Sequence, residues 1–327
     1  MGRSRVTVTD VAHLAQVSRQ TVSNALNRPE IVKPDTLARV RAAVAELGYR
    51  PMPAARLLRS GQSRTIAFAL STNPNGIADR FLHALTSAAQ DRDHRVLLFA
   101  AGSDNEDIRQ YEQLLTGSVV DAFVLADTHR DDRRTAWLAS QGARFAAFGR
   151  PWGGTETHDW VDVDGAAGTR AAVEHLAALG HTRIGFVGWP AGSGAGDDRR
   201  AGWAEAVAAI GSAPDGLSRQ VLDSPGAGFT AAQELLAAGA TALVCASDNL
   251  ALGAWSHART VGAAVVGFDD TPVAAAVGLS SIAQPLREAA DAVVAAVLDG
   301  DADSPHRVLL RPALVERASS TPVGTDL

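Results

Sequence analysis

The chain has 327 residues, of which 46% are hydrophobic and 20% are charged, a composition typical of soluble globular proteins. No apolar run reaches the roughly 18 residues that a membrane span needs. The N-terminal residues, with Arg3 and Arg5, also lack the apolar core of a signal peptide. We therefore expect a cytoplasmic protein without a membrane partner.

The net charge of -6 is distributed unevenly along the chain. Residues 1–64 contain 11 Arg and Lys against 4 Asp and Glu, whereas the remainder contains 19 against 32. A basic head joined to an acidic body indicates a module that binds a polyanion, followed by a regulatory domain. The length allows such a small module together with a large domain.

The sequence contains no recognisable catalytic or metal-binding framework. The single cysteine, Cys245, lies in an apolar run typical of a buried strand, where a thiol is inert. The histidines show no ligand spacing, so we expect neither a metal nor a cofactor. Residues 192–196 are rich in glycine but lack the Lys-Ser/Thr of a nucleotide loop, and we interpret them as the rim of a pocket.

Residues 18–27 predict a short helix with a polar outer face. Ser18 suits the N-cap, because its hydroxyl can accept from a first-turn amide. Helical spacing directs Val22, Ala25 and Leu26 into a core. The side chains left facing outward are Arg19, Gln20, Ser23 and Asn24. Arg, Gln and Asn can bind base edges in a major groove, although an ordinary polar surface helix is the alternative.

The preceding residues 9–15 predict another helix, with Thr9 as its cap and Asp10 in its first turn. Its apolar stripe is formed by Val11, Leu14 and Ala15. Only two residues separate this helix from Ser18, and so tight a connection indicates a helix-turn-helix.

A third helix is expected to follow a loop over residues 28–33. Pro34 suits its first position and Gly48 its C-cap. The apolar stripe consists of Leu37, Val40, Val44 and Leu47. The basic segment 49–63 is either a plain linker or a hinge.

From residue 65 onward, the pattern predicts an α/β fold with two parallel sheets. Apolar runs predict strands at residues 66–70, 96–99, 122–125, 145–148, 184–187, 242–244 and 264–266. Amphipathic segments predict helices at residues 81–90, 108–115, 134–140, 169–179 and 202–210. Two such series indicate two lobes, with a ligand in the cleft at the carboxyl ends of the strands.

The run Val17-Ser18-Arg19-Gln20-Thr21-Val22-Ser23-Asn24-Ala25-Leu26-Asn27 resembles the DNA-binding headpiece of the lactose-repressor (LacI/GalR) family. The body carries similar landmarks, including Gly180-His181-Thr182-Arg183, Arg199-Arg200-Ala201-Gly202-Trp203 and Gly267-Phe268-Asp269-Asp270. Gln16 departs from the Gly or Asn that is frequent in the turn of the family. Glutamine tolerates a positive φ there at a modest cost.

The resemblance implies a helix-turn-helix headpiece over residues 1–50 and a hinge over 51–63. A two-lobed, periplasmic-binding-protein-like domain for effector binding and dimerisation would occupy 64–327, with the chain crossing between lobes near residues 161, 284 and 309. In this family a hinge helix enters the minor groove and a leucine kinks the DNA. Ala55 and Leu58 match that pattern, whereas Met52 and Pro53 depart from it.

The resemblance also implies the residues of two binding sites. DNA contacts are assigned to Thr9, Ser18, Arg19, Gln20, Thr21, Ser23, Asn24, Asn27, Ala55 and Leu58. Effector contacts are assigned to Asn73, Asp79, Phe81, Arg150, Trp189, Arg199, Ser247, Asp248 and Asp269. The alternative for the charged residues is a salt bridge between lobes or at a helix end, and for Trp189 it is a plug in the lobe interface.

Taken together, these features imply a repressor of carbohydrate-utilisation genes, and not an enzyme. It would bind a pseudo-palindromic DNA operator as a homodimer and respond to a sugar or sugar derivative in the cleft. Residues 259–264 and Asp223-Ser224-Pro225 depart from the family and leave the sugar open. A purine-type corepressor is the main alternative, ahead of a transport-type sugar-binding protein or an enzyme that uses the cleft.

Overall fold

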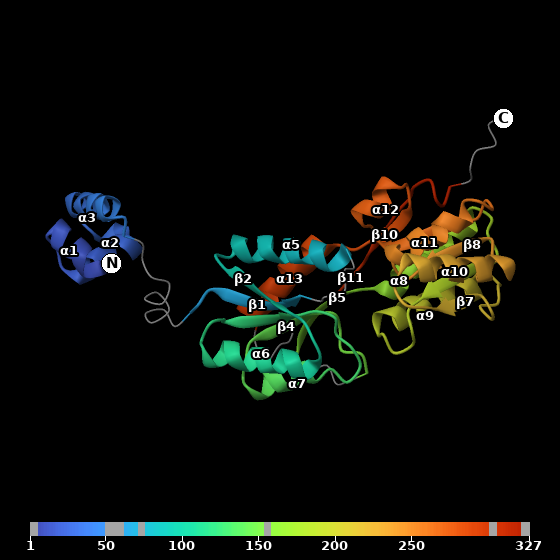
Figure 1. The fold of residues 1–327 in the computed structure, drawn as a ribbon, viewed down its shortest axis with the longest axis horizontal. Coiled ribbons are helices and arrows are strands. Elements are labelled where there is room, and N and C mark those ends of the chain that lie inside the picture. Colours follow the sequence, from blue (N-terminus) through green and yellow to red (C-terminus); the bar gives the residue numbers. More distant parts are fainter. Residues whose placement is uncertain (1–5, 50–61, 71–75, 154–157, 301–305, 322–327) are drawn as a thin grey trace. The chain divides into compact units, whose positions relative to one another are not determined.

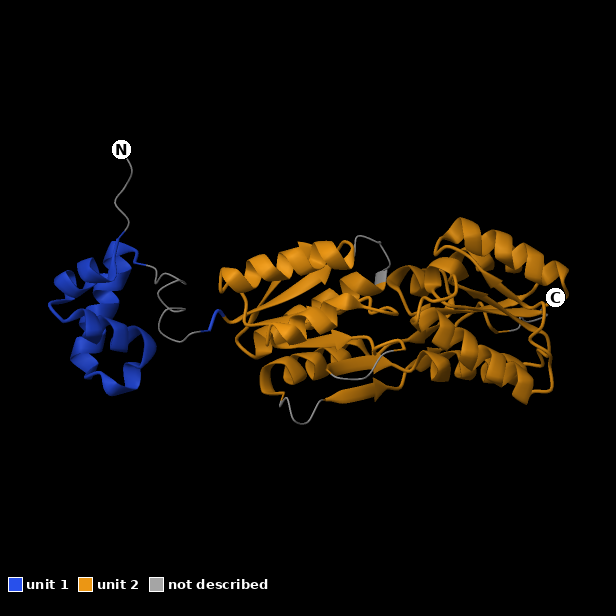
Figure 2. Cartoon of the chain, turned by 90° about the horizontal axis from the view of Figure 1, so that it is seen from below, with its two compact units in different colours: residues 1–63 blue, residues 64–327 orange. Residues whose placement is uncertain are grey.

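The computed structural model describes residues 6–49, 62–70, 76–153, 158–300 and 306–321. The chain divides into two compact units, Met1–Ser63 and Arg64–Leu327 (Figure 2). No helix among the described residues is long and apolar enough to cross a membrane.

The first unit is a small helical headpiece. Its elements are α1 (Val8–Ala15), α2 (Arg19–Asn27), the 3-10 turn η1 (Pro29–Ile31) and α3 (Pro34–Leu47). The predicted core residues Val22 and Val40 are buried, and Gly48 ends α3 in the left-handed conformation with φ of 62°. Gln16 closes α1 with φ of 53°, so the turn has the positive φ anticipated for this position.

Two details of α1 correct the sequence-based prediction. The N-cap is Thr7 and not Thr9, because Thr7 and Asp10 form a capping box in which each side chain bonds the backbone of the other. Leu14 is 43% exposed, and Ala12 takes its expected place in the core. Residues 28–33 were expected to be a plain loop, and η1 lies within them.

The second unit contains two six-stranded sheets within the described residues (Figure 1). The first sheet, in spatial order, consists of β11 (Arg307–Leu310), β5 (Asp159–Val163), β4 (Phe145–Phe148), β3 (Ala122–Leu125), β1 (Thr65–Leu70) and β2 (Arg95–Ala100). The second consists of β12 (Ala313–Val315), β10 (Ser280–Ala283), β9 (Ala264–Asp269), β8 (Ala242–Cys245), β6 (Ile184–Gly188) and β7 (Ser218–Gln220). All described strand pairs are parallel except β10 with β12. We call the layers around these sheets lobe 1 and lobe 2.

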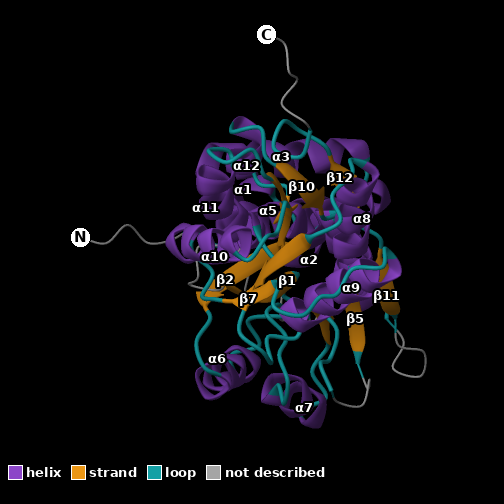
Figure 3. Ribbon diagram, turned by 90° about the vertical axis from the view of Figure 1, so that its right-hand side faces the viewer, coloured by secondary structure: helices purple, strands orange, loops and turns teal. Residues whose placement is uncertain are grey.

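Helices cover both faces of each sheet (Figures 1 and 3). In lobe 1, α5 (Gly76–Asp91) and α13 (Leu286–Asp299) pack on one face, opposite α6 (Asp104–Thr116) and α7 (Arg133–Ser140). In lobe 2, the helices are α8 (Gly165–Ala178), α9 (Ala195–Ala209), α10 (Pro225–Ala237), α11 (Asp248–Ala258) and the short α12 (Pro272–Ala276). Phe268 of β9 faces α8 while its neighbour Gly267 faces α11, because successive residues of a strand point to opposite faces.

The predicted α/β fold is confirmed, with longer helices than expected at several places. Helix α9 begins at Ala195 and not at residue 202, and α5 begins at Gly76 and not at residue 81. The chain passes between lobes at Asp164, after β10 and between β11 and β12. Because the strands of both sheets run parallel apart from β12, these crossings bring the carboxyl ends of several strands to the space between the lobes.

Candidate functional site

The polar face of α2 is an ordered surface of the headpiece. Ser18 caps the helix by accepting from the backbone amide of Thr21 at 3.0 Å. Gln20 donates from Nε2 to Oδ1 of Asn24, one helical turn further on, at 3.0 Å. This hydrogen bond orients both side-chain amides. Arg19 is exposed, and its guanidinium has no hydrogen-bond or ion-pair partner among the described residues. An exposed guanidinium next to two oriented side-chain amides suits the recognition of base edges.

The other predicted DNA contacts surround this face. Thr9, Ser18 and Arg19 line one hollow of 570 Å³, together with His13, which the sequence analysis did not select. Further along α2, Asn27 donates to the backbone carbonyl of Ser23 at 2.6 Å. The hinge predictions, Ala55 and Leu58 together with Met52 and Pro53, lie outside the described residues.

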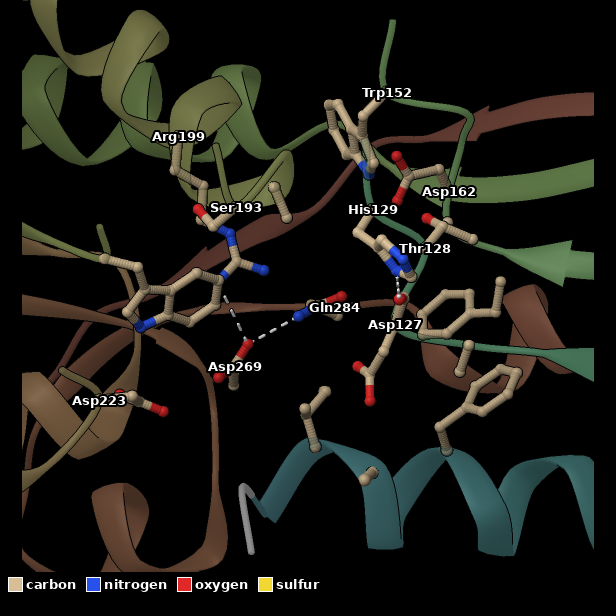
Figure 4. A pocket seen from close by; sticks show the side chains of 18 of the residues that line it. Asp127, Thr128, His129, Trp152, Asp162, Ser193, Arg199, Asp223, Asp269 and Gln284 are labelled. Carbon is tan, nitrogen blue, oxygen red and sulfur yellow. Dashed lines mark hydrogen bonds and ion pairs between the residues drawn. The ribbon is translucent and has the colours of Figure 1, made fainter. Parts of the chain in front are cut away.

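A cavity of 400 Å³ lies between the two lobes of the second unit (Figure 4). Its size falls in the range of about 300–1,000 Å³ that is typical of small-molecule sites. Lobe 1 contributes most of the apolar side chains of the wall, whereas lobe 2 contributes both apolar and polar ones, including Arg199 and Asp269. The residues that the argument below uses are Phe81, Trp152, Asp162, Trp189, Arg199, Asp223, Asp269 and Gln284.

Arg199 and Asp269 are the central charged pair of the cavity. Nη1 of Arg199 lies 3.8 Å from Oδ1 of Asp269 and donates to the carbonyl of Ala246. Gln284 donates to the same Asp269 oxygen at 2.7 Å (Figure 4). Nε of Arg199 is buried and has no hydrogen-bond partner among the described residues. A buried donor without a hydrogen-bond partner favours the binding of a ligand that supplies a hydrogen-bond acceptor.

The Arg199 guanidinium is also held between aromatic rings. Its central carbon lies 3.7 Å from the ring centre of Phe268 and 5.0 Å from that of Trp189. Stacking on both rings fixes the plane of the guanidinium and stabilises its charge. The indole Nε1 of Trp189 is a second buried donor without a partner in the described part of the chain.

Asp269 is unusual in both its backbone and its ionisation. Its φ of 108° lies in a region that L-residues rarely adopt, and the following Asp270 has φ of 50°. Such strain costs about 1–3 kcal/mol per residue and is concentrated at functional sites. Burial raises the pKa of Asp269 to about 7, against the opposing attraction of Arg199. A ligand hydroxyl that donates a hydrogen bond to the Asp269 carboxylate would favour its ionised form.

The structure brings Phe81, Trp189, Arg199 and Asp269 of the predicted effector residues into the cavity wall. Asp79 is exposed on α5 and lies outside the lining. Asn73 lies outside the described residues. Phe81 stacks on Phe148 with ring centres 4.0 Å apart, so it contributes an apolar floor and not a polar contact.

Arg150, a further predicted effector residue, is not part of the lining and instead joins the two lobes. Its Nε lies 2.9 Å from Asp162 of lobe 1, and its Nη2 donates to Asp198 of lobe 2 at 2.8 Å. Burial raises the pKa of both carboxyl groups, while the guanidinium opposes that rise. Arg150 thus fits the alternative of a salt bridge between lobes.

Ser247 and Asp248 lie behind the cavity wall. Ser247 caps α11 and donates its hydroxyl to Asp223 at 2.5 Å. Asp248 is 1% exposed and accepts from Ser281 and from the amide of Thr271, both at 2.6 Å. Their hydrogen-bonding capacity is used within lobe 2, where they hold Asp223 and the segment after β9 in place.

Several lining residues were not selected from the sequence. Asp162 lies on β5, Trp152 follows β4, Asp223 follows β7, and Gln284 follows β10. A signal was present, since polar or aromatic residues at the carboxyl ends of parallel strands are where ligands bind. Selecting among the many such residues requires knowledge of which strand ends face the other lobe.

Comparison with known proteins finds family matches in both units of the chain. Residues 7–52 match the family described as bacterial regulatory proteins, lacI family, and residues 173–320 match the periplasmic binding protein-like domain. Among solved structures, the transcriptional regulator CelR-cellobiose complex is similar with a TM-score of 0.70 and 31% identity, covering 96% of this chain and 100% of that chain. The Lac repressor bound to ONPG in the repressed state is similar with a TM-score of 0.85 and 27% identity, covering 97% and 100%.

Similarity to curated proteins extends over nearly the whole chain. The HTH-type transcriptional regulator CelR of Thermobifida fusca is 34% identical over 342 residues, which cover 97% of this chain and 99% of that protein. The regulator AglR of Rhizobium meliloti (strain 1021) is 30% identical, with 97% and 95% covered. These relatives are transcriptional regulators and not enzymes. The chain therefore belongs to the lacI family of bacterial transcriptional regulators.

Proposed function

We propose that this regulator is a cytoplasmic repressor of carbohydrate-utilisation genes, controlled by a sugar that binds between its lobes. It binds a pseudo-palindromic operator as a homodimer, because one headpiece covers only a half-site. The observation that carries the proposal is the buried Arg199 of the cavity, which faces Asp269 and has an unpaired Nε donor. A carboxyl group and a guanidinium side by side suit adjacent sugar hydroxyls.

Two further observations support a sugar as the effector. The cavity wall includes aromatic side chains, such as Trp152 and Trp189, that can cover an apolar sugar face. The similar CelR structure is a complex with cellobiose.

In the headpiece, the side chains that would read operator bases are Arg19, Gln20 and Asn24. Phosphates would be bound by Thr9, Thr21 and Ser23. Leu58 would act in the hinge.

The contacts of Arg80 suggest how the cavity is coupled to lobe closure. Arg80 of α5 in lobe 1 donates from Nη1 to the carbonyls of Asp269 and Asp270 in lobe 2, each at 2.6 Å. The same Asp269 presents its carboxyl group to the cavity. A ligand that binds this carboxyl group acts on a strained turn that also joins the lobes. It shifts the lobe equilibrium to the extent that it binds one arrangement more tightly.

The proposal is tested by selecting DNA from a randomised duplex pool with the full-length protein. We expect an inverted repeat to be enriched, with two half-sites related by the dimer axis. Titration of that duplex by fluorescence anisotropy, with and without hexoses, disaccharides and purine bases, then identifies the effector. Enrichment of no repeat, or an operator affinity that no sugar changes, would contradict the proposal. A response to purines alone would favour a purine-type corepressor.

Replacing Arg19 by alanine should relax base preference at one position of each half-site by about 1–3 kcal/mol. The exposed guanidinium has no intramolecular partner among the described residues, so its removal leaves the fold of the headpiece intact. Competition titrations with operator variants measure the preference at each position. Arg41→Ala, an exposed arginine of α3, is the matched control and should leave every preference unchanged. If Arg19→Ala weakened all sequences equally, Arg19 would be a phosphate contact.

A further inference from the structure

The hollow in the headpiece lies where the end of α1 meets the start of α2. Its wall is formed by Thr9, Ala12, His13, Gln16, Val17, Ser18 and Arg19. Gln16 ends α1 in the left-handed conformation, and its amide donates to the carbonyl of His13 at 3.2 Å. The sharp turn that results places the first turn of α2 beside the last turn of α1, with the hollow between them.

His13 is the titratable group of this hollow. Its side chain is exposed on α1 and has no hydrogen-bond or ion-pair partner among the described residues. Thr9 lies four residues earlier, on the same face of the helix. Arg19 lines the hollow from α2. The hollow therefore presents an imidazole from one helix and a permanent cation from the other.

The charged groups around His13 leave it available to an external anion. Asp10 is the other charged residue of α1. It accepts from the amide and the hydroxyl of Thr7 at 2.7 and 2.8 Å, and these bonds lower its pKa more than the attraction of His13 does. Arg19 is the charged residue of α2. Helix α3 also packs on α1, but none of its charged residues lines the hollow, namely Asp35, Arg39, Arg41 and Glu46.

The position of His13 on α1 indicates which part of the DNA it meets. In a helix-turn-helix, the second helix contacts base edges in the major groove, while the first helix crosses the sugar-phosphate backbone. A residue of α1 that faces the start of α2 therefore lies on the side of the phosphates. A protonated imidazole has two N–H donors and no acceptor, which suits phosphate oxygens.

We propose that His13 binds a DNA phosphate and that this contact makes DNA binding depend on pH near neutrality. Histidine titrates close to neutral pH, and a phosphate favours its charged form. The complex therefore holds protons that the free protein does not hold. By linkage, the affinity for DNA decreases as the pH rises from 6 to 8. The inference concerns DNA binding alone and is independent of the effector.

Fluorescence anisotropy of the full-length protein tests the inference. The probes are a labelled duplex that carries the selected inverted repeat and a duplex of equal length with a shuffled sequence. We expect both to bind at least fivefold more tightly at pH 6 than at pH 8, at one ionic strength. His13→Gln should remove this difference, whereas His13→Lys should bind tightly at both pH values. His83→Gln, at an exposed position of α5, is the matched control and should retain the difference.

The salt dependence provides a second readout, which a purely structural role of His13 would not change. Each phosphate contact adds about 0.9 to the slope of log affinity against log salt concentration, so a dimer should have a slope steeper by about 1.8 at pH 6 than at pH 8. His13→Gln should have equal slopes at both pH values. Thermal melts show whether the variants are folded, and if one is not, the other decides, because each removes the pH dependence.

Two results would overturn the inference. One is a pH difference that persists unchanged in the folded His13 variants. The other is an effect of His13→Gln that is confined to one base position of the operator and absent from the shuffled duplex. The second result would make His13 a base contact.

Discussion

Replacement of Arg199 by lysine is expected to lower effector affinity at least 30-fold and to abolish the response of operator binding at effector concentrations that saturate the unmodified protein. Lysine keeps the positive charge towards Asp269 but cannot offer the planar fork that stacks between Trp189 and Phe268. Hydrogen bonds from charged groups contribute about 1.5–3 kcal/mol each, which corresponds to one or two powers of ten in affinity. Calorimetry with the identified sugar measures the loss.

The same variant should bind operator normally when no effector is present, because Arg199 lies in the second unit and not in the headpiece. Arg200→Lys, at the exposed neighbouring position of α9, is the control for a general effect on that helix. Thermal melts without sugar show whether the fold is retained. If Arg199→Lys unfolds, Arg199→Met combined with Asp269→Asn removes both charges together and avoids an unpaired buried one. Unchanged sugar affinity in a folded variant would show that Arg199 is not an effector contact.

Replacement of Gly253 by alanine should destabilise the second unit by about 3 kcal/mol or more. Helices α10 and α11 approach so closely here that a Cβ on Gly253 would lie 1.8 Å from the backbone carbonyl oxygen of Pro225. The facing Gly228 is equally confined, since its Cβ would lie 2.2 Å from the carbonyl oxygen of Leu250. Backbone atoms cannot move aside as side chains do, so the two helices must separate.

A melt of the full-length protein measures this effect, with an expected decrease of the midpoint by roughly 6–12 °C. Gly226→Ala is the matched control, because the same change in α10 meets no atom within 4 Å. It should leave the midpoint unchanged or raise it slightly, since alanine favours a helix over glycine. Similar midpoints for the two variants would mean that the helices are packed less tightly than these contacts require.

Local interactions explain why the headpiece was predictable. Ser18 as the cap of α2, Pro34 at the start of α3 and Gly48 after its end all act within one or two turns. The error at α1 has the same origin. Thr9 and Thr7 are both suitable caps, and the choice falls to Thr7 because Asp10 lies three residues beyond it and completes the capping box.

Helix α9 was predicted less well, because its buried face is not simply apolar. Gly202 packs on the backbone of α8, where a Cβ would lie 2.2 Å from the carbonyl oxygen of Ala166. Arg199 is buried one turn earlier, where it donates to the carbonyl of Ala246 and faces Asp269 within lobe 2. Glycine and arginine interrupt the apolar period that marks a helix in sequence, so the first two turns were not recognised.

The sequence alone determined the helix-turn-helix, the alternation of strands and helices, and the location of a candidate ligand site at the carboxyl ends of the strands, since each depends on local propensity and spacing. Only the tertiary structure decided which polar residues face that site. Arg199 and Arg150 were both assigned as effector contacts, yet one faces the cavity and the other joins the lobes. Asp223 and Gln284 reach the wall from the carboxyl ends of two strands, β7 and β10, that are far apart in the chain. Their proximity follows from the packing of the two sheets and leaves no local pattern in the sequence.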